Sequence, residues 1–180
     1  MTNTAYFDLT GLELPDSLEL LRKAFGETVE IGYAETGDPN VKLTRDVMGP
    51  ITLCEGIGAF TLDLGGRMIS GTRGADGADG EAGCRGGPAI AVASDTAITV
   101  RDDSAIPGAV RGGKGGWGNP PGEGGAAIVD KQGRPVSVSG RQDLVVPGAQ
   151  GTPPKGGALF LVKWADGRDV RRPSVPPRDG

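Results

Sequence analysis

The sequence predicts a mainly β protein, and three observations lead to this fold class. Apolar residues alternate with polar ones in several short stretches, as they do in half-buried strands. Glycine recurs at every third position through residues 71–86, which is the period of collagen. Helical spacing is seen in one short stretch before residue 30. We therefore expect a small N-terminal α+β unit, a collagen-like Gly-X-Y stalk and a glycine-rich β-repeat or β-helix-like C-terminal module.

The first unit, residues 1–64, is expected to dock onto a larger assembly. Asp16 and Glu19 have the spacing of a helix capping box, and Gly26 supplies a stop. Apolar residues recur at helical spacing in the same stretch: Leu14, Leu18, Leu21 and Phe25. Strands are predicted at residues 29–33, 41–43, 51–53 and 60–64.

The second unit, residues 65–87, contains the glycine triplets Gly71, Gly74, Gly77, Gly80, Gly83 and Gly86. Three polyproline-II chains can wind around one axis only if every third residue lacks a side chain, so these glycines predict a homotrimer stalk. Two alternatives remain open: a solvated glycine-rich linker and a polyglycine bundle formed by one chain. The unbroken phase of the glycines favours the trimer over the linker.

The third unit, residues 88–164, is expected to repeat one module. Residues 86–90 are similar in sequence to residues 124–128 and 156–160. Residues 98–100 are similar to residues 136–138, and residues 106–109 are similar to residues 146–149. Such repeats pack each module on the next. Residues 165–180 are rich in proline and arginine, and we expect them to run as an extended tail.

The loop 112–125 is the candidate recognition site. It is rich in glycine, and we predict that its residues Lys114, Trp117 and Asn119 contact a receptor or partner. An indole offers a large contact area with little side-chain entropy to lose. The alternative is that Trp117 packs under the loop as its anchor. Residues 108–114 also match the start of a phosphate-binding loop, but Gly115 stands where a Ser or Thr must hold Mg²⁺, so we expect no nucleotide there.

Composition argues against several function classes. The net charge is −4, so we expect neither nucleic acid nor a membrane as partner. The chain has no histidine, and its two cysteines, Cys54 and Cys84, lack metal-binding spacing. We therefore expect no enzyme, no metal and no cofactor, and we expect free thiols. The enzymatic alternative is a polysaccharide depolymerase that uses Asp95, Asp102 or Asp103.

The collagen-like GTRGADGADGEAG, followed by GGPAIAVASDTAITV and GGKGGWGNPPGEGG, resembles the tail-tip and tail-fibre proteins of tailed bacteriophages. The resemblance covers roughly residues 65–165. It implies a structural protein of the phage tail, assembled in the host cytoplasm. It also implies that the protein contacts other tail or baseplate proteins and a host receptor or glycan. A capsid decoration or head-fibre protein is the alternative.

Overall fold

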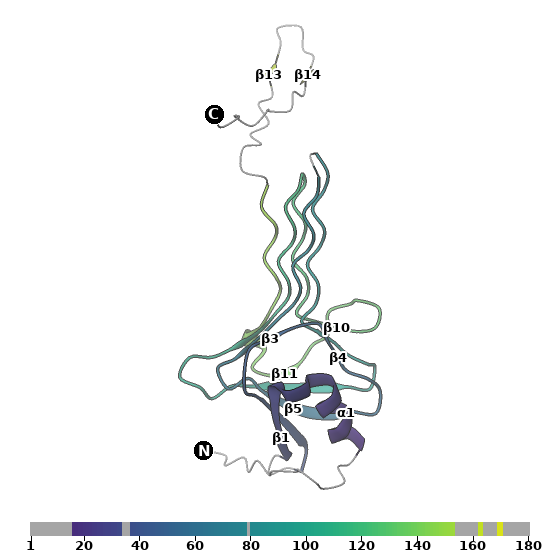
Figure 1. Ribbon diagram of the computed structural model, residues 1–180, viewed down its shortest axis with the longest axis vertical. Coiled ribbons are helices and arrows are strands. Elements are labelled where there is room, and N and C mark those ends of the chain that lie inside the picture. Colours follow the sequence, from purple (N-terminus) through teal and green to yellow (C-terminus); the bar gives the residue numbers. More distant parts are fainter. Residues whose placement is uncertain (1–15, 34–36, 79, 154–161, 164–168, 171–180) are drawn as a thin grey trace.

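The computed structural model describes residues 16–33, 37–78, 80–153, 162–163 and 169–170 of the 180-residue chain. It consists of a broad base of helix and strands and a narrow stalk of extended chain that rises from one side of the base (Figure 1). The described helices include none that is long and apolar enough to cross a membrane.

The α-helix α1 (Asp16–Phe25) confirms the predicted helical segment. Leu18, Leu21 and Phe25 are buried, and the Phe25 ring meets the ring of Phe60 edge-on, with centroids 6.4 Å apart. Asp16 and Glu19 both lie in the first turn, where carboxylates interact favourably with the helix dipole. Leu14 lies outside the described residues. A short 3-10 turn, η1 (Gly26–Thr28), follows the helix.

The remaining elements are short strands and one further 3-10 turn. They are β1 (Val29–Tyr33), β2 (Pro39–Leu43), β3 (Val47–Met48), β4 (Ile51–Thr52), β5 (Ala59–Asp63), β6 (Met68–Ser70), β7 (Ile90–Ala91), β8 (Ala97–Arg101), β9 (Ala109–Arg111), β10 (Ile128–Val129), β11 (Ser139–Gly140), η2 (Gln142–Leu144), β12 (Val145–Val146), β13 (Val162–Lys163) and β14 (Asp169–Val170). The predicted mainly β class and the predicted strands of the first unit are confirmed.

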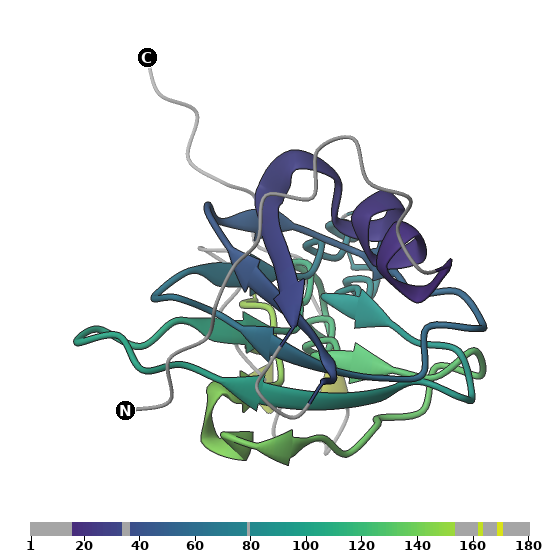
Figure 2. The same ribbon diagram turned by 90° about the horizontal axis from the view of Figure 1, so that it is seen from below.

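The chain passes through three sheets in the same order on successive passes. The sheets have the orders β1-β2-β5-β8-β11, β12-β9-β6-β3 and β10-β7-β4, and a separate pair joins β13 to β14. Apart from the β1–β2 hairpin, the strands of the three sheets pair in parallel. Each pass of chain therefore stacks on the previous one, and Figure 2 shows the strands layered beneath α1.

The alternating pattern of the strands builds one core. Val41, Leu62 and Val100 occupy matching register positions in β2, β5 and β8, and each is almost fully buried. The buried apolar cluster runs from Leu18 to Leu144 and includes residues from both sides of position 64. The first unit and the third unit thus share sheets and a core.

The structure supports one of the predicted repeat matches and corrects two. Ile90 pairs with Ile128, as the match of residues 86–90 with 124–128 requires. Thr99 pairs with Ser139 rather than with Ser137, and Val146 pairs with Arg111 rather than with Ile106. The two Pro-Gly pairs therefore do not occupy equivalent positions, because Gly108 precedes strand β9 and Gly148 follows strand β12. Residues 156–160 lie outside the described residues.

The stalk is made of extended segments that leave the base between strands. Residues 71–77 and 82–87 extend between β6 and β7, residues 112–118 and 122–127 between β9 and β10, and residues 147–151 follow β12. The polyproline-II conformation has no internal hydrogen bonds, so its backbone groups need partners outside the segment. Here the neighbouring segments supply them. For example, the Gly74 and Gly113 amides donate to the carbonyls of Lys114 and Gly87, both at 2.8 Å.

Close packing explains why these segments are glycine-rich. A Cβ on Gly74 would overlap the carbonyl of Cys84, one on Gly113 that of Thr72, and one on Gly116 that of Ala75. We call this assembly of segments the glycine bundle. Residues 71–77, 112–118 and 147–151 form one row, and residues 82–87 and 122–127 lie in a second row against it.

The glycine content of a bundle segment rises with the number of segments that it contacts. The central segment 112–118 bonds to every other segment of the bundle and places glycine at two of each three positions. The outer segment 71–77 touches only two segments and needs glycine at one position in three. Because three residues make one turn, the non-glycine positions of these two segments face outward.

The prediction that these glycines form a collagen-like triple helix is therefore corrected. Gly71, Gly74, Gly77, Gly83 and Gly86 pack on backbone of the same chain, which is the one-chain polyglycine bundle left open by the sequence. Gly80 differs from these five, because its φ is +81° and it lies in the turn between the first two segments. Triplet phase alone does not distinguish the two structures, because both exclude side chains at every third residue of a polyproline-II segment.

Replacing Gly116 by Ala should destabilise the bundle by about 1–3 kcal/mol, because the new methyl group overlaps the Ala75 carbonyl. Thermal unfolding measures the loss, and Lys114→Ala, at an exposed position of the same segment, is the matched control with little effect. Since the contacts are within one chain, the loss caused by Gly116→Ala should be the same at low and at high protein concentration. A loss seen only at concentrations where the chains associate would mean that these glycines hold separate chains together.

Candidate functional site

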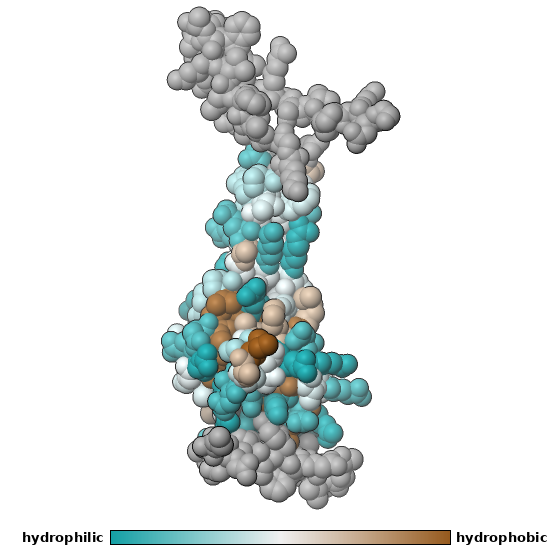
Figure 3. Space-filling model, turned by 90° about the vertical axis from the view of Figure 1, so that its left-hand side faces the viewer, coloured by the Kyte–Doolittle hydropathy of each residue, from teal (hydrophilic) through white to brown (hydrophobic). Residues whose placement is uncertain are grey.

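The predicted recognition residues lie on or next to the central segment of the glycine bundle. Gly112, Gly113, Gly115 and Gly116 are buried against the neighbouring segments, whereas Lys114 and Trp117 are exposed. Two residues of each turn are used for packing, so the third points to solvent. In the space-filling view, hydrophilic residues in teal line the stalk above a base with brown apolar areas (Figure 3).

Trp117 is held in place through its backbone while its ring stays accessible. Its amide donates to Asp76 Oδ1 at 2.7 Å, and its carbonyl accepts from the Gly77 amide at 2.7 Å. The side chain is still 44% exposed. The indole is thus not packed under the loop, as the alternative interpretation required.

Two residues outside the predicted set complete the surroundings of Trp117. The Arg73 guanidinium lies 5.8 Å from the centroid of the indole, within the range of a cation–π contact. Its Nη2 also pairs with Asp76 Oδ1 at 2.5 Å. Asp76 therefore joins the guanidinium and the Trp117 backbone. A collagen-like stalk would pair Arg73 with a carboxylate of a neighbouring chain, but this ion pair lies within one chain.

Asn119 is exposed but does not share the outward face of Lys114 and Trp117. It lies two residues beyond Trp117, in the turn where the chain reverses, and its amide donates to the Glu81 carbonyl at 2.7 Å. Arg111 does share that face, because it lies one turn before Lys114 and is exposed. The triplet phase that marks Lys114 and Trp117 would have identified Arg111 as well.

We call Arg111, Lys114 and Trp117 the outward row. Neither Arg111 nor Lys114 forms an ion pair with any residue that the structure describes. The charge of the adjacent Arg73 is balanced by Asp76. The outward row therefore carries two unbalanced positive charges on a protein whose net charge is −4.

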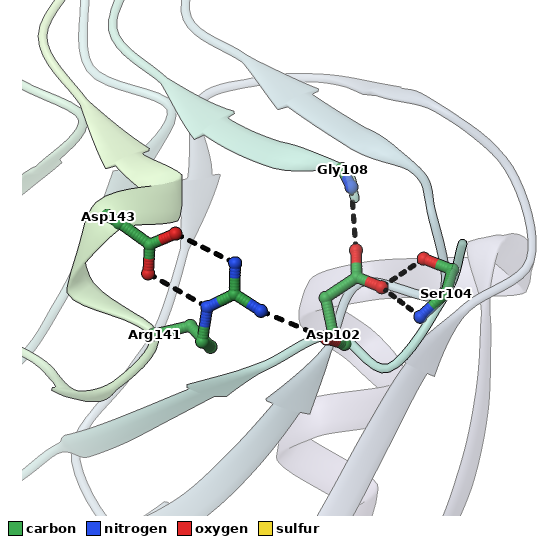
Figure 4. Close-up of polar contacts among 5 residues, drawn as sticks. All are labelled: Asp102, Ser104, Gly108, Arg141 and Asp143. Atoms are coloured by element: carbon green, nitrogen blue, oxygen red, sulfur yellow. Dashed lines mark hydrogen bonds and ion pairs between the residues drawn. The ribbon is translucent and has the colours of Figure 1, made fainter. Parts of the chain in front are cut away.

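The carboxylates of the enzymatic alternative each have a structural partner. Asp95 accepts a hydrogen bond from the Gly56 amide at 2.7 Å. Asp103 pairs with Arg101 at 2.5 Å on the exterior. Asp102 is buried and points into the turn that precedes β9 (Figure 4). These contacts hold turns and strand ends in place.

Asp102 ties three backbone amides of the base together. Its carboxylate accepts from the amides of Gly108 at 2.6 Å, Ser104 at 2.9 Å and Gly66 at 3.1 Å, and from the Ser104 hydroxyl. Burial acts to raise the pKa of Asp102, but these hydrogen bonds outweigh it, so the pKa lies below the ordinary value of 3.8. Arg141, paired with Asp143 at 2.8 Å, also approaches the Asp102 carbonyl (Figure 4).

The described residues offer no cluster of three or more His, Cys, Asp or Glu that could hold a metal ion. Asp79, an acidic residue of the glycine-triplet segment, lies outside the described residues. Cys54 and Cys84 are both free and exposed in this chain. In comparisons with known proteins, no family model, curated protein or solved structure matches this chain.

Asp102→Asn should destabilise the fold by about 1–3 kcal/mol at pH 7, because an amide has one acceptor oxygen where the carboxylate has two. A folded-state pKa below the unfolded one adds stability that is complete above the unfolded pKa and is lost as pH falls through the folded one. Denaturant unfolding should therefore show the gap between wild type and variant shrinking below about pH 4. Asp103→Asn, at an exposed position, is the control, and an equal loss in both variants would contradict this role.

Proposed function

We propose that this chain is a non-enzymatic structural protein of a tailed-phage virion, a trimeric tail-tip or tail-fibre component that helps attach the phage to its host. The observation that carries the proposal is the glycine bundle, which forms a stalk above the base (Figure 1) and leaves Lys114 and Trp117 exposed. The base would dock onto other tail or baseplate proteins. No nucleic acid, membrane or cofactor is needed for this role.

The construction of the stalk supports an attachment role. Backbone hydrogen bonds tie each segment to its neighbours, so the outward side chains are displayed from a rigid frame and are free of core packing. Rigid display lowers the ordering cost of binding. Residues that are not used for packing can change without disturbing the bundle, which suits a surface that must match a host.

Two further features belong to this proposal. The base is a short β-helix-like coil, supported by the order in which successive passes visit the three sheets. The homotrimer remains part of the proposal, although the bundle satisfies its triplet glycines within one chain and leaves association to other surfaces. The head-fibre or capsid decoration protein stays as the alternative, because a stalk on a base suits either location.

Immunogold labelling of the virions that carry this protein should place it at the tail tip or tail fibres. Virions lacking the protein, labelled in parallel, are the control for antibody specificity. Label on the head would favour the decoration protein, and virions without label would contradict a virion role.

The purified protein should also compete with virions for attachment to host cells. Trp117→Ala should compete several-fold less well while its melting temperature is unchanged, because the contacts that hold this residue are made by its backbone. Ile106→Ala, which alters an apolar side chain that is 81% exposed in the base, should compete normally. Equal competition by all three proteins would remove Trp117 from the attachment surface.

A further inference from the structure

We propose that the outward row of the glycine bundle, Arg111, Lys114 and Trp117, binds an acidic polysaccharide that lies along the stalk. The proposal rests on the attachment function proposed above and names the chemistry of what is bound. Three observations carry it: the period of the row, its unbalanced positive charge, and an exposed aromatic ring at its far end.

The period of the row suits an extended polymer. Residues three apart in a polyproline-II segment face the same way, and three residues rise about 9 Å. Arg111, at the end of β9, and Lys114 and Trp117, on the central segment, are therefore spaced regularly along one line, and their carbonyls accept in turn from the amides of Gly71, Gly74 and Gly77. Their backbone cannot shift, because the glycines between them are packed against carbonyls of the neighbouring segments. A ligand with a repeat of similar length meets each side chain without reshaping the protein.

The charge of the row selects an anionic ligand. Arg111 and Lys114 are exposed and have no carboxylate partner among the described residues. In each ion pair of the described surface, by contrast, a carboxylate balances the charge of the cation. A cation left unpaired on an acidic protein attracts carboxylate or phosphate groups, whereas it neither strongly attracts nor repels neutral groups. Two such charges suit a ligand with periodic acidic groups.

The ring selects a saccharide among anionic ligands. The indole of Trp117 is 44% exposed, so part of it is free for the apolar C–H face of a sugar ring. The polar groups beside the ring are already fixed, because Asp76 joins the Arg73 guanidinium to the Trp117 amide. Arg73 over the indole holds its orientation at 5.8 Å and leaves guanidinium donors for sugar hydroxyls. An aromatic platform with fixed polar neighbours is a common form of saccharide site.

Direct binding of the purified, full-length protein tests the proposal. The probes are polysialic acid, hyaluronan and polygalacturonate, each immobilised, with methyl-esterified polygalacturonate as the uncharged counterpart. We expect binding to at least one acidic polymer, at least tenfold weaker binding to the esterified form, and weakening as the salt rises from 0.1 to about 1 M, where screening shortens to about 3 Å.

The variants separate the contributions of the row. Trp117→Ala should lower affinity about threefold to tenfold, and Trp117→Tyr should restore part of it because a ring is kept. Lys114→Gln and Arg111→Gln should each lower affinity and flatten the salt dependence. Arg85→Gln removes an exposed cation from segment 82–87 in the second row and should bind as the wild type does. Unchanged melting temperatures show that all variants are folded.

Each outcome decides. Failure to bind any of the acidic polymers, equal binding to the esterified form, or wild-type binding by Trp117→Ala and Lys114→Gln overturns the proposal. If the protein still competes for attachment but binds a purified host surface protein instead, the attachment function stands and the polysaccharide does not. If it binds acidic polysaccharide but is absent from the tail, the inference stands and the proposed function fails.

Discussion

Backbone hydrogen bonding between glycine segments is the constraint on which the stalk depends. A polyproline-II segment leaves its amides and carbonyls unsatisfied within itself, so it is stable away from water only beside similar segments. In this chain the amides of Gly74, Gly113 and Gly125 reach carbonyls of neighbouring segments at 2.8 Å. The segments approach so closely that a Cβ on any of these three glycines would overlap a neighbouring carbonyl. Composition, spacing and the outward display of the remaining side chains all follow from this one requirement.

The base provides what the glycine bundle lacks, which is apolar burial. Glycine segments contribute almost no side-chain area, whereas Phe60, Leu62 and Ile69 are each at most 2% exposed in the base. The parallel sheets also set where each segment starts, since the strands β6, β9 and β12 are paired directly before their segments leave. Asp102 secures the turn before β9 through amides of Gly66 and Gly108. The position of the outward row is therefore fixed by the core beneath it.

The candidate site is an exposed surface on which several contacts orient one aromatic ring. Trp117 is oriented by its own backbone, by Asp76 and by the guanidinium of Arg73, and none of these contacts covers the whole ring. The arrangement places charged and aromatic groups at repeat distances along a line. A polymer is the natural ligand of such a line, whereas a small molecule would meet only one side chain. The same geometry tolerates replacement of the outward residues, because they take no part in the packing of the glycines.

Local pattern determined a good part of this protein from sequence alone. The helix ending at Phe25 and the strands of the first unit follow from the spacing of apolar residues, which is a property of short stretches. The triplet glycines likewise showed that polyproline-II segments pack closely. Only the tertiary structure decided that the packing partners belong to the same chain, that Arg73 and Asp76 lie beside Trp117, and that Val146 pairs with Arg111. There are two physical reasons. Steric exclusion at every third residue is the same whether the neighbouring segment comes from another chain or from the next pass of this one. The register between distant strands depends on the length of the segment that connects them.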